Sequence, residues 1–423
     1  MSLFRRSMTL CAAAALALSG CGGGSESDQA GPKTIEWWHI QNTDPMRPVW
    51  DALAKEYSAA HPGVTIKITA LENEAYKAKL TTVTQSGGAP DIFHTWGGGV
   101  LRQQVEAGLV KDITSDIAPW SGTLSPISKQ PYQIEGKTYA VPFDIGMVGF
   151  WYNKALFEKA GIAEPPATWS EFLSDVRKLK AAGVTPIALA GKDKWPGHYY
   201  WSYLAMRVGG AQAFTTAGAE RNFTGPDFVA AGRHLKELVD LDPFQRGFLG
   251  TAFDTPDGEA AAMGNGQAAM ELMGQWAPAV QREQSGKDLG EDLGFFPFPA
   301  VDGGKGSISD VFGGGGGFAV GKDAPPEAVD FLKFISQAES QRKAVATGAV
   351  LPVTQGAENA VKDANLLLVQ RTLAEATGFQ LYLDQAFPPA VGQEVNDSVA
   401  ELIAGSKTPE QVTQEITTTA KTG

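Results

Sequence analysis

Cysteine is almost absent from this chain of 423 residues, which has only Cys11 and Cys21. Because both lie near the start, the rest of the chain can contain no disulfide, no cysteine nucleophile and no cysteine metal ligand. Histidine is nearly as rare, and the five histidines form no short-range pair, so the sequence argues against a zinc site. We therefore expect neither a metal nor a cofactor.

Positive charge and long apolar runs are also scarce. The formal net charge is −12, and it becomes −14 without residues 1–20, which hold two arginines and no acidic residue. Such an acidic surface argues against nucleic acid and against anionic lipid as partners. No apolar run approaches the roughly 20 residues that cross a membrane. The hydrophobic content of 43% nevertheless suffices for a large core, and the length is enough for two domains.

The start of the chain has the pattern of an export signal. A pair of arginines and a short apolar run precede the sequence Leu-Ser-Gly, which leads into Cys21. This order resembles a bacterial lipoprotein signal, which implies that residues 1–20 are removed and that Cys21 carries lipid on the extracellular face of the cell membrane. An ordinary secretory signal with an incidental cysteine is the alternative. Residues 21–32, rich in glycine and serine, are expected to form a flexible tether.

Beyond the tether, apolar residues alternate between strand-like and helix-like spacing. Residues 34–39 and 65–70 have the pattern of strands, and a third strand begins at Asp91. Helical spacing fills the intervals, with a break at His-Pro-Gly over residues 61–63. This order predicts an α/β fold with a parallel sheet covered by helices.

The same alternation resumes after residue 143. Residues 149–154 and 186–190 are expected to be strands, and Thr168 with Glu171 forms the pattern of a capping box at the start of a helix. A strand is expected over residues 318–320, with helices dominating from Ala328 to the end.

Short motifs follow one another along the chain: IEWWH (35–39), HPGV (61–64), SGGAPDIF (86–93), AGLV (107–110), YAVPF (139–143), WYNK (151–154), PATWSEF (166–172), GQAAM (266–270), GQWA (274–277) and the helix of 328–338. Each is weak alone, but their order and spacing resemble one known family. That family is the extracellular solute-binding proteins of ABC importers, in the carbohydrate-binding group that includes maltose-binding protein. The resemblance covers nearly all of the chain after the tether.

The resemblance implies a periplasmic-binding-protein-like fold of two α/β lobes. The N-terminal lobe would comprise residues 33–143 and 302–352, and the C-terminal lobe residues 147–300 and 356–420. A hinge would let the lobes close on a ligand held in the cleft between them. Physical reasoning agrees, because ligands of open α/β sheets bind beyond the carboxyl ends of the strands and clefts between lobes are favoured pockets.

Ten tryptophans offer flat faces for the C–H patches of a sugar. Trp276 corresponds to a stacking tryptophan of the resembled family, with core packing as the alternative. Trp195, in a polar loop after a strand, and Trp96, at a strand end, are the other candidates, with the same alternative. Core packing is expected for Trp50, Trp151, Trp169 and Trp201, which lie in apolar patterns.

Polar candidates are the side chains that follow predicted strands, because sugar hydroxyls need planar hydrogen-bonding partners. Asp144 is one, although the acidic position of the resembled family aligns nearer Gly146. Gly314 lies in a glycine run without the Lys-Ser/Thr continuation of a phosphate loop, so we expect a mobile crossing or a close backbone approach to ligand. A solvated loop side chain is the alternative for each polar candidate. The remaining candidates are His39, Gln41, Asn42, Asn73, Tyr76, Lys192, His198 and Asp384.

The leading hypothesis is a monomeric, lipid-anchored receptor that captures an oligosaccharide by hinge closure and delivers it to the permease subunits of an ABC importer, without chemistry. The run WWHIQN (37–42) resembles xylo-oligosaccharide (xylobiose) binders of actinobacteria; cello-, malto- and chito-oligosaccharides stay open. A surface glycoside hydrolase is the second hypothesis. It needs two carboxylates about 5–10 Å apart, and no catalytic spacing such as Gly-x-Ser-x-Gly is present. A binder of another solute class is the third.

Overall fold

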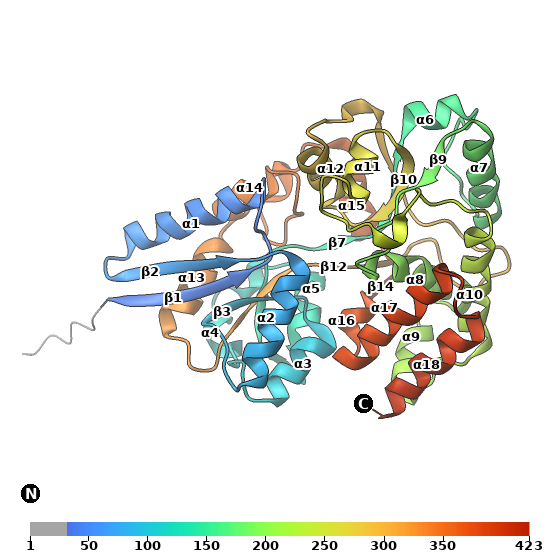
Figure 1. Cartoon of the computed structure of the whole chain (residues 1–423). Helices are drawn as coiled ribbons and strands as arrows, with labels where there is room; N and C mark the ends of the chain where they lie inside the picture. The colour runs from blue at the N-terminus through green and yellow to red at the C-terminus, as the bar shows by residue number, and fades with distance from the viewer. Residues whose placement is uncertain (1–31, 423) are drawn as a thin grey trace, which may run out of the picture.

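The computed structural model of the protein describes residues 32–422. It has two lobes of strands and helices, joined by strands that run between them (Figure 1). This is the two-lobed α/β architecture that the sequence predicts. The predicted signal peptide, Cys21 and all of the tether except residue 32 lie outside the described residues.

The first lobe is built on a five-stranded sheet of order β2-β1-β3-β13-β6. As predicted, β1 (Lys33–His39) pairs in parallel with β2 (Val64–Ala70) and β3 (Ile92–Thr95). The other two strands come from later in the chain, and β13 (Gly317–Val320) is antiparallel to both β3 and β6 (Ala140–Pro142).

Helices cover both faces of this sheet. One face of α1 (Met46–Ala60) is buried. Its Trp50 packs against Trp37 of β1, with the two ring centroids 5.4 Å apart. Both Trp37 and Trp38, on opposite faces of β1, are buried. The other main helices of this lobe are α2 (Asn73–Gln85), α3 (Gly98–Glu106), α13 (Pro326–Ile335) and α14 (Ala338–Val345).

The second lobe has a four-stranded sheet of order β11-β8-β10-β9. Its central strands are β8 (Gly149–Asn153) and β10 (Ala268–Met273), flanked by β9 (Thr185–Ile187) and β11 (Leu293–Phe296). Only β9 and β10 are parallel, because β8 runs antiparallel to both of its neighbours. The expectation that the parallel arrangement continues in this half is therefore wrong for β8, and β11 is a strand that the sequence analysis does not predict.

Helices of the second lobe bury most of its aromatic residues. The predicted capping box is present at the start of α7 (Trp169–Ala181), where Thr168 and Glu171 each bond to the other's backbone. The long helix α8 (Trp195–Gly209) is buried along nearly its whole length. It packs against α10 (Pro226–Val239) and α17 (Pro389–Ile403), and α18 (Pro409–Thr422) closes the chain.

A three-stranded sheet connects the lobes. Its order is β14-β12-β7, from β14 (Gly378–Leu381), β12 (Asp310–Gly314) and β7 (Gly146–Met147). Figure 1 shows β7 and β12 running between the two lobes. The chain passes from β6 through β7 into β8, and returns from β12 into β13. The glycine run that was expected to be a mobile crossing is thus largely paired strand.

Shorter elements complete the fold. Within residues 32–422, no helix combines the length and the apolar character that crossing a membrane requires. The remaining elements are α4 (Thr114–Ile117), α5 (Pro126–Lys129), α6 (Lys154–Lys159), α9 (Ala213–Glu220), α11 (Glu259–Gly264), α12 (Ala277–Ser285), α15 (Ala364–Ala374), α16 (Leu383–Ala386), β4 (Gln133–Ile134), β5 (Lys137–Thr138) and the 3-10 helices η1 (Ser121–Thr123), η2 (Gln130–Tyr132), η3 (Phe248–Gly250), η4 (Gly290–Asp292) and η5 (Glu358–Ala360).

Candidate binding cleft

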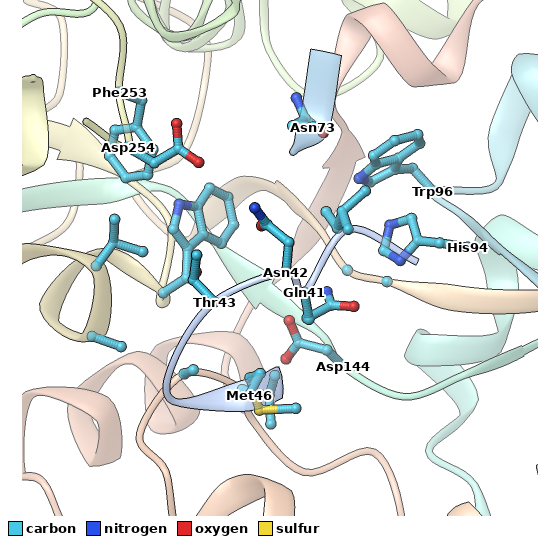
Figure 2. A pocket seen from close by; sticks show the side chains of 18 of the residues that line it. Gln41, Asn42, Thr43, Met46, Asn73, His94, Trp96, Asp144, Phe253 and Asp254 are labelled. Atoms are coloured by element: carbon cyan, nitrogen blue, oxygen red, sulfur yellow. The ribbon is translucent and has the colours of Figure 1, made fainter. Parts of the chain in front are cut away.

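A cleft lies where the two lobes face each other. The loop after β1, the start of α2 and the end of β3 provide its first-lobe wall, and Figure 2 shows Gln41, Asn42, Asn73 and Trp96 lining it. The second-lobe wall consists of Trp195, Tyr199, Phe253, Asp254, Trp276 and Glu283. The crossing segments and the short helix α16 complete it with Asp144, Tyr382, Asp384 and Gln385.

Capping and a cross-lobe bond position the first-lobe wall. Glu72 caps α2 by accepting hydrogen bonds from the backbone N–H groups of Glu74 and Ala75, which places Asn73 at the first turn beside the cleft. The loop after β1 reaches the opposite wall, where the Thr43 hydroxyl donates to Glu283 Oε2 at 3.2 Å.

Aromatic rings form part of both walls. Trp96 of the first lobe and Trp195 and Trp276 of the second are each only partly buried, unlike the tryptophans of the two cores. Tyr382 stacks on Tyr199 with ring centroids 5.4 Å apart, and Trp276 meets Tyr382 edge-on at 6.4 Å. The cleft therefore has flat apolar surfaces on both sides.

Several polar atoms of the cleft are buried and have no hydrogen-bond partner among the described residues. They are Gln41 Oε1, both ring nitrogens of His94, the Tyr382 hydroxyl, Asp384 Oδ1 and Gln385 Oε1. Buried polar groups of proteins are nearly always hydrogen-bonded, because leaving them unpaired costs about 1–3 kcal/mol each. This concentration of unpaired donors and acceptors marks a place that suits a ligand rich in hydroxyl groups.

Asp144 sits at the junction of three chain segments. Its Oδ2 accepts from Gln275 Nε2 at 2.6 Å, and its Oδ1 accepts from the Leu351 N–H at 2.8 Å. Burial raises the pKa of Asp144 to about 7, against the opposing effect of these hydrogen bonds. A Cβ atom at Gly146 would lie 1.6 Å from Gln275 Oε1. The side chain of Gln275 thus fills the space beside Gly146 and leaves no room there for a side chain, while Asp144 lies in the cleft lining.

Comparison with known proteins identifies the family. Residues 43–342 match the family model of bacterial extracellular solute-binding proteins. The chain belongs to this family. As expected for solute-binding proteins, the fold is shared with solved structures along almost the whole chain.

The solute-binding protein resembles two structures with a TM-score of 0.84. One, at 28% identity, comes from a study of xylan utilisation by Caldanaerobius polysaccharolyticus and covers 91% of this chain and 99% of that one. The other, at 25% identity, is described as a chitin oligosaccharide binding protein; the match covers 92% of this chain and 98% of that one.

Curated proteins related in sequence have similar levels of identity. An uncharacterised ABC transporter extracellular-binding protein of Pyrococcus horikoshii is 27% identical over 67% of this chain and 66% of its own length. A melibiose/raffinose/stachyose-binding protein of Bacillus subtilis is 23% identical over 95% of this chain and 92% of its own length. A multiple sugar-binding protein of Streptococcus mutans is 26% identical over 73% of this chain and 72% of its own length.

Eight of the thirteen predicted ligand-binding residues of this solute-binding protein line the cleft. Lys192 is exposed outside the lining, and four others lie behind it. Tyr76 is buried, with its hydroxyl donating to the His94 carbonyl at 2.7 Å, so it supports the wall that holds Trp96. The residues in the lining are Gln41, Asn42, Asn73, Trp96, Asp144, Trp195, Trp276 and Asp384.

His39 and Gly314 also lie behind the lining. His39 is fully buried, and burial lowers its pKa to about 3, so the ring is neutral. Gly314 is paired within β12, and a Cβ there would lie 2.5 Å from the Tyr382 ring. This glycine therefore makes room for an aromatic side chain of the cleft.

The segment of Trp195 and His198 is not the predicted loop. It begins α8, because Pro196 at the start of the helix and the apolar residues that follow favour a buried helix. His198 is fully buried, and burial lowers its pKa to about 3. Its Nδ1 lies 2.9 Å from the Trp195 carbonyl and its Nε2 4.0 Å from Asp384 Oδ1.

Sequence reasoning missed several lining residues. Tyr199 lies in an apolar helical run that indicates core, and nothing in the local pattern distinguishes Asp254 or Glu283 from surface carboxylates. Tyr382 could have been found, since it is two residues from the candidate Asp384. Among the described residues, no group of three or more His, Cys, Asp or Glu side chains could hold a metal ion.

Proposed function

We propose that this solute-binding protein captures an oligosaccharide between its lobes and delivers it to the permease subunits of an ABC importer. The observation that carries the proposal is the pairing of exposed aromatic faces from both lobes with buried, unpartnered polar atoms in one cleft. Pyranose rings need both, because their C–H faces pack on aromatic rings while their hydroxyls donate and accept hydrogen bonds. The sugars named for the relatives agree with this reading.

Xylobiose or a slightly longer xylo-oligosaccharide is the ligand we propose first. The structure from the study of xylan utilisation, at 28% identity, supports it. The chitin oligosaccharide binding protein at 25% identity keeps chito-oligosaccharides as the principal alternative, alongside cello- and malto-oligosaccharides. We also propose that Cys21 anchors the protein to the outer face of the membrane, as its lipoprotein-like signal implies, and that it acts as a monomer.

The alternative of a glycoside hydrolase receives less support. Both carboxylate oxygens of Asp144 already accept hydrogen bonds from Gln275 and Leu351, which suits a structural carboxylate better than a nucleophile. The family is one of solute-binding proteins, and the curated relatives named above are described as binding proteins.

A panel of oligosaccharides on the purified protein tests the proposal. A ligand of the native state raises the melting temperature in proportion to the logarithm of its concentration over Kd. We expect at least one of xylobiose, xylotriose, cellobiose, maltotriose and diacetylchitobiose to raise it, with isothermal titration giving one site. Chromatography of the same mixtures after a day should recover the sugar intact. Release of monosaccharide would favour the hydrolase, and a response to none of the sugars would overturn the proposal.

A further inference from the structure

The ionisable side chains that line the cleft are nearly all acidic. Carboxylates come from the loop after β1, the crossing segment, the second-lobe wall and α16, whereas Lys77 is the one cation among the lining residues. The lining histidine, His94, is neutral, because burial lowers its pKa to about 3. The five carboxylates are those of Asp44, Asp144, Asp254, Glu283 and Asp384.

Neighbouring cations offset little of this charge: burial raises the pKa of Asp384, and Lys77 is the one cation in the described part of the chain that lowers it. Within residues 32–422, none of the five forms a salt bridge with a lysine or an arginine. Within that range the one ionisable partner is His198, whose Nε2 lies 4.0 Å from Asp384 Oδ1. Because burial lowers the pKa of His198, its ring is neutral. Lys77 is itself occupied, since its Nζ lies 2.9 Å from Glu74 Oε1.

The negative charge spans both walls of the cleft. Burial raises the pKa of Asp254 in the second lobe, and the carboxylates of Glu72 and Glu74 at the start of α2 raise it further from the opposite lobe. Burial likewise raises the pKa of Glu283, and Asp44 of the first lobe and Asp254 add to that effect. An additional anion placed between the lobes would meet repulsion from both sides.

We infer that the cleft selects uncharged sugars and rejects sugars that carry a carboxylate, the hexuronic acids. This inference rests on the proposed function. A hexuronic acid keeps the ring and the secondary hydroxyls of a neutral pyranose and carries a carboxylate at C5, where a hexose has its hydroxymethyl group and xylose only hydrogen, so the aromatic faces do not distinguish it from the neutral sugar. Its carboxylate would be buried among like charges, and the one cation of the lining, Lys77, is already paired with Glu74, whereas neutral hydroxyls donate hydrogen bonds to the resident carboxylates.

Matched ligands separate charge from shape. The neutral disaccharide that binds best in the panel is compared, by isothermal titration at pH 8 and low salt, with the disaccharide in which a hexuronic acid replaces one neutral sugar unit, and with the methyl ester of that acid. The ester keeps the added bulk but not the charge. We expect the acid to bind at least about tenfold more weakly than the neutral sugar, which corresponds to roughly 1.4 kcal/mol, and the ester to bind within about threefold of it.

Each other outcome has a distinct meaning. Equal affinity for the acid and the neutral sugar overturns the inference and leaves the proposed function standing. An ester as weak as the acid also overturns it, since exclusion would then be steric. If no neutral sugar binds, the proposed function falls and the selection falls with it.

Charge-removing variants locate the selection in the cleft. The double variant Asp254→Asn with Glu283→Gln keeps the shape of both side chains. We expect it to reduce the ratio of the affinity for the neutral sugar to the affinity for the acidic sugar at least threefold. The double variant Glu220→Gln with Glu375→Gln, at two exposed positions outside the cleft lining, removes the same number of charges and should leave the ratio unchanged. A ratio that is the same in the double variant and in the wild type would contradict the inference.

Discussion

At the scale of single residues, position decides what a tryptophan does. Trp37, Trp50 and Trp151 are fully buried within strands or helices and hold the cores of the two lobes together. Trp96 and Trp276 differ because they follow the ends of β3 and β10, where the chain turns toward the other lobe. The same indole ring thus serves as packing inside a lobe and as a binding surface between lobes.

Replacement of Trp276 by alanine should remove most of the sugar affinity. Loss of the ring's buried apolar surface on the ligand corresponds to roughly 2–3 kcal/mol, or about 30- to 150-fold in Kd. Isothermal titration with the best sugar of the panel measures it. Trp120→Ala is the control, because Trp120 is also partly exposed but does not line the cleft. Unchanged affinity in Trp276→Ala would remove this residue from the site.

Gly314→Ala should weaken binding through Tyr382. The added methyl group would lie 2.5 Å from the Tyr382 ring, so the ring must move away from its place in the cleft. We expect a loss of affinity of about tenfold, with circular dichroism at 25 °C unchanged. Gly250→Ala is the matched control, since a Cβ there meets nothing within 4 Å. Full affinity in Gly314→Ala would show that Tyr382 does not contact the ligand.

At the scale of elements, the sequence predicts strands and helices far better than it predicts their partners. The strands at residues 33–39 and 64–70 and the capping box of α7 are where the patterns place them, because alternation and caps are local signals. The antiparallel pairing of β8 depends on residues more than 100 positions away in β10 and β11, which no local pattern records. The burial of His198 likewise depends on residues that are distant in the sequence, such as Asp384.

One such strand, β10, carries a buried acid in its centre. Glu271 is fully buried, and its Oε1 accepts from Gln281 Nε2 at 2.7 Å while Oε2 has no partner among the described residues. Burial raises the pKa of Glu271 to about 7. Burial and the charge of Glu271 also raise the pKa of Glu259. The folded protein is therefore more stable when these two carboxyl groups are protonated.

This arrangement predicts that the protein loses stability between about pH 5 and pH 8. A carboxyl group whose pKa is higher in the folded state stabilises the fold fully below its unfolded pKa, near 4.5, and this contribution is lost as the pH rises through about 7. Glu271→Gln stays neutral at every pH. We expect it to raise the unfolding free energy at pH 8 by about 2 kcal/mol, with little effect at pH 5.

Denaturant unfolding of the two proteins at pH 5 and pH 8 measures the difference. Glu291→Gln, an exposed glutamate of the same lobe, is the control and should change neither value by more than about 0.5 kcal/mol. An equal effect of Glu271→Gln on the unfolding free energy at both pH values would contradict the raised pKa of Glu271 in the folded state.

At the scale of the whole molecule, the lobes meet at a second place besides the crossing strands. The start of α3 in the first lobe approaches the end of α16 and the segment that follows it, which leads into α17 of the second lobe (Figure 1). Glycine allows this approach, because a Cβ at Gly98 would lie 2.4 Å from the Gln385 carbonyl oxygen and one at Gly99 2.3 Å from that of Phe387. The sequence predicts the two lobes, but not this contact between backbones.

Gly99→Ala should therefore hold the lobes apart. The methyl group cannot be accommodated by rotation of a side chain, since the atom that it meets is a backbone oxygen. A ligand that binds best with both walls in place would then have to restore that contact at a cost, and its apparent affinity falls with the population of the competent state. We expect a larger radius of gyration by small-angle X-ray scattering and at least about tenfold weaker sugar binding. Gly122→Ala, where a Cβ meets nothing within 4 Å, should behave as the wild type. A compact Gly99→Ala protein with full affinity would show that the contact between α3 and the segment after α16 is not needed for closure.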